Sequence, residues 1–230
     1  MSTIIVEAWL QNKRRARPRR WIGTVRAMGR PRRFDESDLL DAATELFWSK
    51  GFDNTSVEDV SLATGVGNGS IYAAYGSKRG LFLAAFERYC ERRARLVREA
   101  IGSTSGPARS AVRALFQAII DDCAAHPDRR GCLMINSIAH LGTRIPEVAA
   151  IGARTTTAME QGVAERLRPA MRHAGDLDEA ALSALSANIV VVAQGLIQLS
   201  RLGIPANRLR EIADVSCDAL PSSWADQLVH

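Results

Sequence analysis

The sequence predicts an all-α fold, with three short helices near the amino terminus followed by a larger helical domain. Apolar residues recur at spacings of three and four along most of the chain, which is the period of a helix buried on one face. Alanine, leucine and arginine are abundant and aromatic residues make up 6% of the chain, a composition that favours helices. With 230 residues, 47% of them hydrophobic, the chain can bury a substantial core.

The first two helices follow from their apolar stripes and their ends. From Asp35, the run LLDAATELFWSKGF carries one stripe and stops at Gly51. Thr55 and Glu58 have the T-x-x-E spacing of a capping box, so we expect a second helix from there to Gly65. The stripe residues are Leu39, Ala42, Ala43, Leu46 and Phe47 in the first helix, and Val57, Val60, Leu62 and Ala63 in the second.

The third helix, SIYAAY, is expected to begin at Asn68 or Ser70, and a long fourth helix runs from the cap Ser77 to Gly102. Gly, Pro and polar clusters divide the rest into helical hairpins. The expected helices span about 107–125, 132–141, 146–172, 178–202 and 206–220. We therefore divide the chain into a leader (1–29), a small helical domain (30–78) and a larger helical domain (79–230).

Positive charge is concentrated at the amino terminus. Residues 1–33 hold ten Lys or Arg and one acid, Glu7, so the other residues carry 20 bases and 24 acids. The basic segment, rather than the body of the protein, is therefore expected to attract polyanions. Residues 1–29 read as a poorly ordered leader, and regular helical periodicity begins after Met28. Two interpretations stay open: Met28 is the true start, or the leader is an arm that adds nonspecific attraction to nucleic acid.

The glycine-rich stretch GVGNGSIYAAYGSK, residues 65–78, does not match a phosphate-binding loop. A Walker loop needs Gly-Lys-Ser/Thr, whereas Lys78 follows Ser77. A dinucleotide fingerprint needs glycines at its first, third and sixth positions after a strand. Gly65, Gly67 and Gly69 occupy the first, third and fifth positions, after a segment that reads as a helix.

The same stretch fits a helix-turn-helix. Gly65 supplies the positive φ of a tight turn, and the small Ser61 lets the two helices cross closely. Val66 and Ile71 fill the space between them. Glycines at the start of the second helix leave thin backbone and free amides, which suits a helix that enters the major groove of DNA.

Residues 29–90 closely resemble the amino-terminal DNA-binding domain of the TetR family of bacterial transcriptional regulators. The motifs A-x-x-L-F-x-x-K-G-F, T-S-V-x-D-V, G-V, S-I-Y-x-x-Y and G-S-K-x-x-L-F occur in that order. The resemblance implies a homodimeric regulator, most simply a repressor, that binds an inverted-repeat operator in double-stranded DNA. It also implies that the rest of the chain is a helical domain for effector binding and dimerisation.

The resemblance implies roles for individual residues of the motif. Thr55 and Ser56 would meet phosphate, and Tyr75 and Lys78 would hold the DNA backbone. The residues implied to face the bases or the groove wall are Asn68, Gly69, Ser70 and Tyr72, and Gly67 is also a candidate for DNA binding. Two positions depart from the family pattern, because Gly67 replaces a capping Ser or Thr and Ala74 replaces a common His. Ala73 or Ala74 could still contact thymine methyl groups.

Some of these residues also have a structural interpretation. Tyr72 and Tyr75 could be core aromatic residues, although the motif favours a hydroxyl on phosphate. Arg30, Arg32 and Arg33 could be a solvated charge run. Their place before the first helix, with Pro31 stiffening the arm, favours phosphate tracking or entry into the minor groove.

Cysteine and histidine spacing predicts no metal site and no cofactor. The four cysteines lack a CxxC pair and the four histidines do not cluster, which fits a reduced, cytoplasmic setting. Cys132 stands at the head of a helix, where a lowered thiol pKa would allow a thiol-based redox-responsive regulator, but a buried structural cysteine is favoured. The longest apolar run, IVVVAQGLIQL, is shorter than the ~20 residues that cross a bilayer.

The larger domain is expected to hold a small apolar effector. It combines flexible methionines with isolated polar groups, which suits an apolar cavity with a few orienting contacts. The candidate effector residues are Met134, Asn136, His140, Met159 and Gln194. The helices at 178–202 and 206–220 are expected to form the dimer interface, with Val191 and Leu199 in it. A helical enzyme and a nonspecific basic nucleic-acid-binding protein are the competing functions, and no nucleophile, base and orienting set supports the enzyme.

Overall fold

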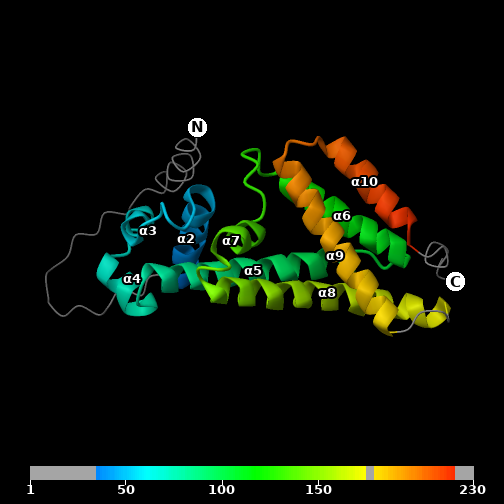
Figure 1. Ribbon diagram of the computed structural model, residues 1–230, viewed down its shortest axis with the longest axis horizontal. Helices are drawn as coiled ribbons and strands as arrows, with labels where there is room; N and C mark the ends of the chain where they lie inside the picture. Colours follow the sequence, from blue (N-terminus) through cyan, green and yellow to red (C-terminus); the bar gives the residue numbers. More distant parts are fainter. Residues whose placement is uncertain (1–34, 175–178, 221–230) are drawn as a thin grey trace, which may run out of the picture. The chain divides into compact units, whose positions relative to one another are not determined.

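The computed structural model describes residues 35–174 and 179–220, and for residues 172–174 the backbone only. These residues form helices α2 to α10 without a β-strand, which confirms the all-α prediction (Figure 1). The chain divides into two compact units, Met1–Ala85 and Phe86–His230. The division lies inside helix α5 (Lys78–Gly102), seven residues after position 78, where we had placed the domain boundary.

The first unit contains α2 (Glu36–Lys50), α3 (Val57–Thr64), α4 (Asn68–Tyr75) and the first residues of α5. Asp35 caps α2 by accepting a hydrogen bond from the Ser37 amide at 2.9 Å. Gly51 ends α2 with a φ of 81°, a value that glycine adopts without strain.

The core of the first unit lies under the predicted stripe of α2, all five residues of which are buried. Ile71 of α4 is also buried. Phe82 of α5 packs edge-on against Phe47 and Phe52, with ring centroids 5.1 and 5.0 Å apart. The prediction for Leu62 was wrong, because its side chain is 79% exposed and the buried residues of α3 are Val57 and Val60.

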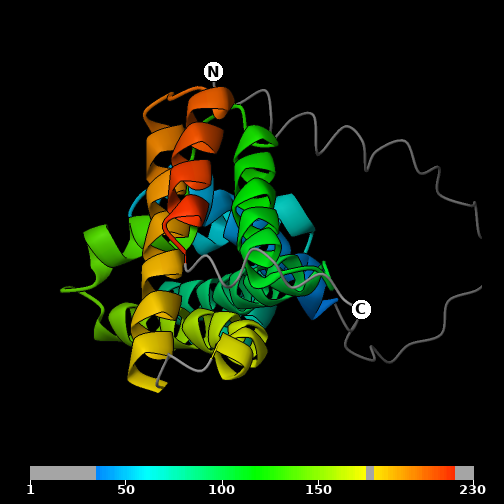
Figure 2. The ribbon, with the colours of Figure 1, turned by 90° about the vertical axis from the view of Figure 1, so that its right-hand side faces the viewer.

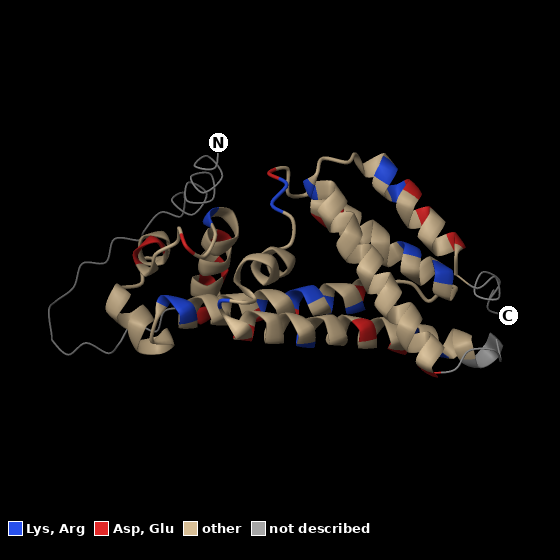
Figure 3. Ribbon diagram, viewed as in Figure 1, with Lys and Arg blue, Asp and Glu red and all other residues tan. Residues whose placement is uncertain are grey.

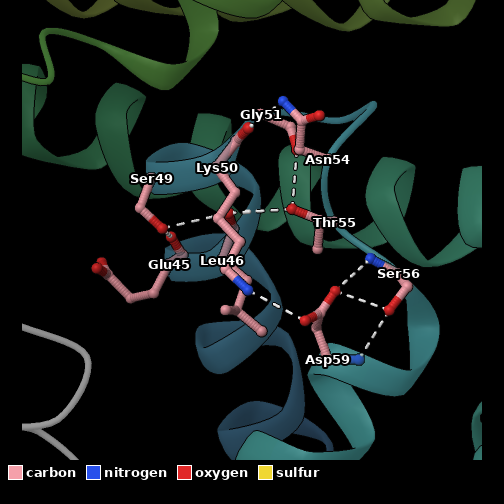
Figure 4. A network of polar contacts seen from close by, with 9 residues as sticks. All are labelled: Glu45, Leu46, Ser49, Lys50, Gly51, Asn54, Thr55, Ser56 and Asp59. Atoms are coloured by element: carbon pink, nitrogen blue, oxygen red, sulfur yellow. Dashed lines mark hydrogen bonds and ion pairs between the residues drawn. The ribbon is translucent and has the colours of Figure 1, made fainter. Parts of the chain in front are cut away.

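The cap of α3 is one residue later than predicted. Ser56, not Thr55, is the N-cap: its hydroxyl accepts a hydrogen bond from the Asp59 amide at 3.0 Å. Asp59 returns the bond by accepting from the Ser56 amide at 2.7 Å, so S-x-x-D forms the capping box (Figure 4). Thr55-x-x-Glu58 fits the same sequence rule one residue earlier, which explains the wrong prediction.

The second unit contains the rest of α5 and five further helices, whose ends agree with the predicted ranges to within two residues. They are α6 (Ala108–Ala124), α7 (Leu133–Leu141), α8 (Pro146–Ala174), α9 (Glu179–Arg201) and α10 (Ala206–Asp218). Helices α6, α9 and α10 lie alongside one another (Figure 2). Glu87 and Arg154 join α5 to α8 through a 3.0 Å ion pair.

Helix α9 is apolar over a longer stretch than the run IVVVAQGLIQL alone. By its length and composition α9 could cross a membrane, but a helix in a protein core can have the same length and composition. It packs against α6, α8 and α10 and buries one face in the core of the second unit. The buried residues are Leu182, Ser186, Ile189, Val190, Ala193, Leu196 and Ile197.

Candidate nucleic-acid interface and ligand cavity

Helices α3 and α4 form a helix-turn-helix around Gly65. Gly65 has the predicted left-handed conformation, with φ 73° and ψ 7°. Its amide donates to the Ser61 carbonyl at 2.8 Å and so closes the last turn of α3. The Thr64 hydroxyl accepts from the Val66 amide at 3.2 Å, which fixes the turn, and Ile71 seats α4 on the core with 1% of its surface exposed.

Helix α4 presents an uncharged surface. Asn68, Gly69, Ser70 and Tyr72 are exposed, and the Tyr72 side chain is 51% exposed. Ala73 and Ala74 are exposed as well, and α4 contains no Lys, Arg, Asp or Glu (Figure 3). This surface offers hydroxyl, amide and methyl groups, which are the groups that distinguish base edges in the major groove.

The start of α4 leaves backbone donors available. Its N-cap is Gly67, which has no side chain and makes no capping hydrogen bond. The first amides of a helix have no partner within the helix, and together with the helix dipole they form a favourable site for a phosphate. Without the usual Ser or Thr hydroxyl at this position, the Asn68 and Gly69 amides have no side-chain cap, whereas the Ser70 amide donates to the Gly67 carbonyl at 2.9 Å.

Tyr75 and Lys78 are both half-buried and tie α4 and α5 to the rest of the first unit. The Tyr75 hydroxyl donates to Glu36 Oε1 at 3.2 Å. Burial, and then the Glu36 charge, raise the pKa of Tyr75 to about 12. Lys78 Nζ donates to the Asp53 carbonyl at 3.1 Å and lies 4.6 Å from the centroid of the Phe52 ring.

Ser56 and Thr55 occupy different environments. Ser56 is exposed, and its hydroxyl is held by Asp59. Hydrogen bonds from the backbone and side chain of Ser56 and then from Lys50 lower the pKa of Asp59 to about 2. Thr55 is 1% exposed, and its hydroxyl donates to the carbonyls of Leu46 and Gly51 at 3.2 and 2.8 Å. The phosphate contact predicted for Thr55 is therefore wrong, because the side chain faces the core.

The remaining candidates for DNA contact, Arg30, Arg32 and Arg33, lie outside the described residues. The same is true of the predicted leader, residues 1–29.

Three of the five candidate effector residues line one apolar cavity in the second unit. Met134, Met159 and Gln194 converge there from α7, α8 and α9. The cavity has about 20 Å³ of space, which is room for one or two water molecules. Its other lining residues are Arg93, Val97, Leu115, Ile119, Cys132, Ile135, Val190, Ala193 and Ile197.

The other two candidate effector residues do not line this cavity. Asn136 accepts a 2.7 Å hydrogen bond from Arg201 Nη1 and donates to the Arg130 carbonyl at 2.8 Å, so it links α7 to the end of α9 and to the preceding loop. His140 is exposed at the end of α7.

A second, polar cavity adjoins the apolar one and shares Arg93, Cys132 and Ile197 with it. The sequence interpretation missed Arg93 as a cavity residue. A signal was present, because Arg93 lies four residues after Tyr89 and four before Val97 on a stripe of α5 that is otherwise buried and apolar. The other residues of the polar cavity are Tyr89, Asp122, Cys123, His126, Arg129, Gly131, Ser200 and Arg201.

Cys132 is the N-cap residue of α7 and is 4% exposed. Its sulfur accepts a hydrogen bond from the Tyr89 hydroxyl at 3.4 Å. The four cysteines are free thiols, and burial raises the pKa of Cys90 to about 12. Burial of Cys132 favours the structural interpretation of this residue over a solvent-accessible sensor.

The outer face of α9 is uncharged and exposed. Between Glu179 and Arg201 the helix has no charged residue (Figure 3). Val191 is 63% exposed, and Leu202 just beyond the helix is 77% exposed. Val215 of α10 is 71% exposed, whereas Leu199 is half-buried.

Comparison with known proteins agrees with this geometry. Residues 39–85 match the model of the family described as bacterial regulatory proteins, tetR family. The uncharacterized HTH-type transcriptional regulator YezE of Bacillus subtilis is 29% identical over 195 residues, which cover 84% of this chain and all of that protein. The HTH-type transcriptional repressor ComR of Escherichia coli is 27% identical over 85% of this chain and 93% of that protein.

The fold agrees as well. A solved structure of a cysteine mutant of the TetR family transcriptional regulator CifR, in complex with 26-bp double-strand operator DNA, superimposes with a TM-score of 0.70. It is 25% identical and covers 84% of this chain and all of that one. Residues 39–85 match the TetR family model, and by its helix-turn-helix and these relatives the chain is similar to TetR family transcriptional regulators.

Proposed function

We propose that this protein is a homodimeric, ligand-responsive transcriptional repressor that binds an inverted-repeat operator in double-stranded DNA. The observation that carries the proposal is the helix-turn-helix around Gly65, whose second helix exposes Asn68, Ser70 and Tyr72 on an uncharged surface. The similarity to ComR, a transcriptional repressor, favours a repressor over an activator. The similarity to CifR in complex with operator DNA favours binding to an operator. We infer a cytoplasmic regulator without catalytic activity.

The contacts with DNA divide into two classes. We assign base readout to Asn68, Ser70 and Tyr72, with Gly67 and Gly69 admitting close approach of the backbone. We assign phosphate contact to Ser56, Tyr75 and Lys78, and to Arg30, Arg32 and Arg33. Phosphate contacts position the protein without reading sequence, so the specificity of the regulator rests on few side chains.

Dimerisation is assigned to the outer faces of α9 and α10. Val191 of α9, Leu202 just beyond it and Val215 of α10 are exposed apolar residues, and α9 has no charge between Glu179 and Arg201. Leu199 contributes less because it is half-buried, and α10 also exposes Arg208, Glu211 and Asp214. Exposed apolar patches on soluble proteins mark interaction sites, and a two-fold dimer uses the same patch on both copies. The symmetry of that dimer predicts an operator with two inverted half-sites.

The ligand response is assigned to the apolar cavity of the second unit. Met134 and Met159 can move aside to enlarge it, and Gln194 supplies a polar contact. Helix α5 carries Lys78 at its start and Arg93 and Val97 in the cavity wall. A ligand that binds the DNA-free conformation more tightly would shift α5 and release the operator.

The experiment is selection of bound fragments from the source genome with the purified protein. We then compare affinity for a duplex with the enriched inverted repeat, for one with a scrambled half-site and for one with both half-sites scrambled. A specific regulator prefers its site over random DNA by about 10³-fold or more. Equal affinity for all three duplexes, with a steep salt dependence, would identify a nonspecific nucleic-acid-binding protein and reject the proposal.

A further inference from the structure

Arg93 is a buried guanidinium with unused hydrogen-bond donors. Its side chain is 10% exposed, and Nη1 donates to Asp122 Oδ2 at 2.6 Å. Among the described residues that is the one hydrogen bond that Arg93 makes, although a guanidinium has five N–H donors. The other Arg93 donors are not fully enclosed, because none of them is among the fully buried side-chain polar atoms that lack a partner in the described part of the chain. These donors are therefore accessible to a ligand in the cavity.

Arg93 stands where the two cavities of the second unit meet. The lining of the polar cavity includes three arginines, Arg93, Arg129 and Arg201, and a single acidic residue, Asp122. The apolar cavity is lined almost entirely by aliphatic and methionine side chains, with Arg93 at its wall. The two spaces as they stand are small, but their lining has the chemistry that suits a negatively charged end and an apolar body once Met134 and Met159 move aside.

We propose that the effector is a small organic monocarboxylate whose carboxylate binds Arg93 and whose apolar body lies against Met134 and Met159. This inference rests on the proposed ligand response and names its ligand class. A planar carboxylate accepts two parallel hydrogen bonds from a guanidinium, and such charge-assisted pairs are the strong ones in proteins. The head group must be compact, because the polar cavity has only about 10 Å³ of space.

Neighbouring charges set the strength of this site. Asn136 accepts from Arg201 Nη1 at 2.7 Å and so holds that arginine beside the polar cavity. Asp122 weakens the binding of a carboxylate ligand, because its own carboxylate already accepts a hydrogen bond from Arg93 and repels a second negative group. Removing the Arg93 charge and removing the Asp122 charge should therefore change carboxylate binding in opposite directions.

The experiment compares each acid with its neutral primary amide, a near isostere, by calorimetry and thermal shift on the full chain without DNA. The probes are hexanoate, octanoate, benzoate and phenylacetate. At least one acid should bind wild-type protein about 10-fold or more tightly than its amide, as expected for a hydrogen bond to a charged group. Arg93→Met should abolish that preference. Asp122→Asn should increase the affinity for the acid several-fold without changing the affinity for the amide.

The controls separate recognition from folding. Arg154→Gln removes an arginine of the second unit whose side chain is 64% exposed. This variant should change the affinity for neither the acid nor the amide. If Arg93→Met does not fold, the double variant Arg93→Met with Asp122→Asn leaves no unpaired charge and decides the question. No acid preference in the wild-type protein, or a preference that survives loss of Arg93, overturns the inference. Operator binding without additive is measured separately, so failure of the regulator proposal is distinguishable from failure of this one.

Discussion

Ser56 and Asp59 cap the first turn of α3 reciprocally: the Ser56 hydroxyl accepts from the Asp59 amide at 3.0 Å, and the Asp59 carboxylate accepts from the Ser56 amide at 2.7 Å. Lys50 Nζ lies 3.0 Å from Asp59 Oδ1 and ties this cap to the end of α2. The network orients the first helix of the helix-turn-helix (Figure 4).

The cap should make the free energy of unfolding depend on pH in the acid range. The pKa of Asp59 falls from 3.8 to about 2 on folding, so its contribution is complete above pH 3.8 and is lost as pH falls through about 2. Asp59→Asn should cost about 1 kcal/mol at pH 7, as typical for a lost cap, and less near pH 2. Urea unfolding of both proteins at the two pH values measures the difference. An equal loss at both values would contradict the assignment.

Thr55 should contribute to stability and not to DNA binding. Thr55→Val keeps the shape of the side chain but removes the hydroxyl that donates to Leu46 and Gly51, which should cost about 1 kcal/mol. The salt dependence of DNA binding should not change, because the residue is buried. A reduced salt slope with unchanged unfolding would restore Thr55 as a phosphate contact.

The sequence predicted the helices well because their ends are marked locally. Gly51 and Gly65 stop α2 and α3, and the stripe of α2 is fully buried as expected. The cap of α3 was misplaced because two overlapping motifs satisfy the same rule. The choice depends on tertiary contacts, since Thr55 reaches the Leu46 carbonyl of α2 and Ser56 does not.

The candidate site was predictable only in part, for the same reason. Motif spacing identified the exposed residues of α4, but not that Leu62 would face outward. In the second unit, the combination of methionines with isolated polar groups predicted an apolar cavity, and Met134, Met159 and Gln194 line one. It did not predict that Arg93 would meet Asp122, which lies 29 residues further along the chain. Such a pair depends on how α5 and α6 pack.

Residues of α4 and α5 should affect DNA binding in two different ways. Asn68→Ala or Ser70→Ala should change which bases are preferred, by about 1–3 kcal/mol at the affected position. Lys78→Ala should weaken all sequences alike and lower the salt slope by about one. Fluorescence anisotropy at several salt concentrations, with operator and random duplexes, measures both effects.

Two checks make that comparison decisive. Lys78 also bonds the Asp53 carbonyl, so the unfolding of Lys78→Ala is measured to confirm that the helix-turn-helix is intact. The second check is the variant Tyr75→Phe, which keeps the ring and removes only the hydroxyl that donates to Glu36. If Lys78→Ala leaves affinity and salt slope unchanged, or if the α4 variants weaken all sequences equally, the division of roles is wrong.

The outer face of α9 should hold the dimer together. Val191→Arg places a charge on a side chain that is 63% exposed, so folding of the chain should be little affected while an apolar interface would be disrupted. We expect a soluble monomer by sedimentation equilibrium, with operator affinity reduced at least 10-fold because one half-site is no longer held by the partner copy. Leu62→Arg changes an apolar residue of the first unit that is 79% exposed, and this variant should remain dimeric. A dimeric Val191→Arg protein that binds the operator normally would place the interface on another surface.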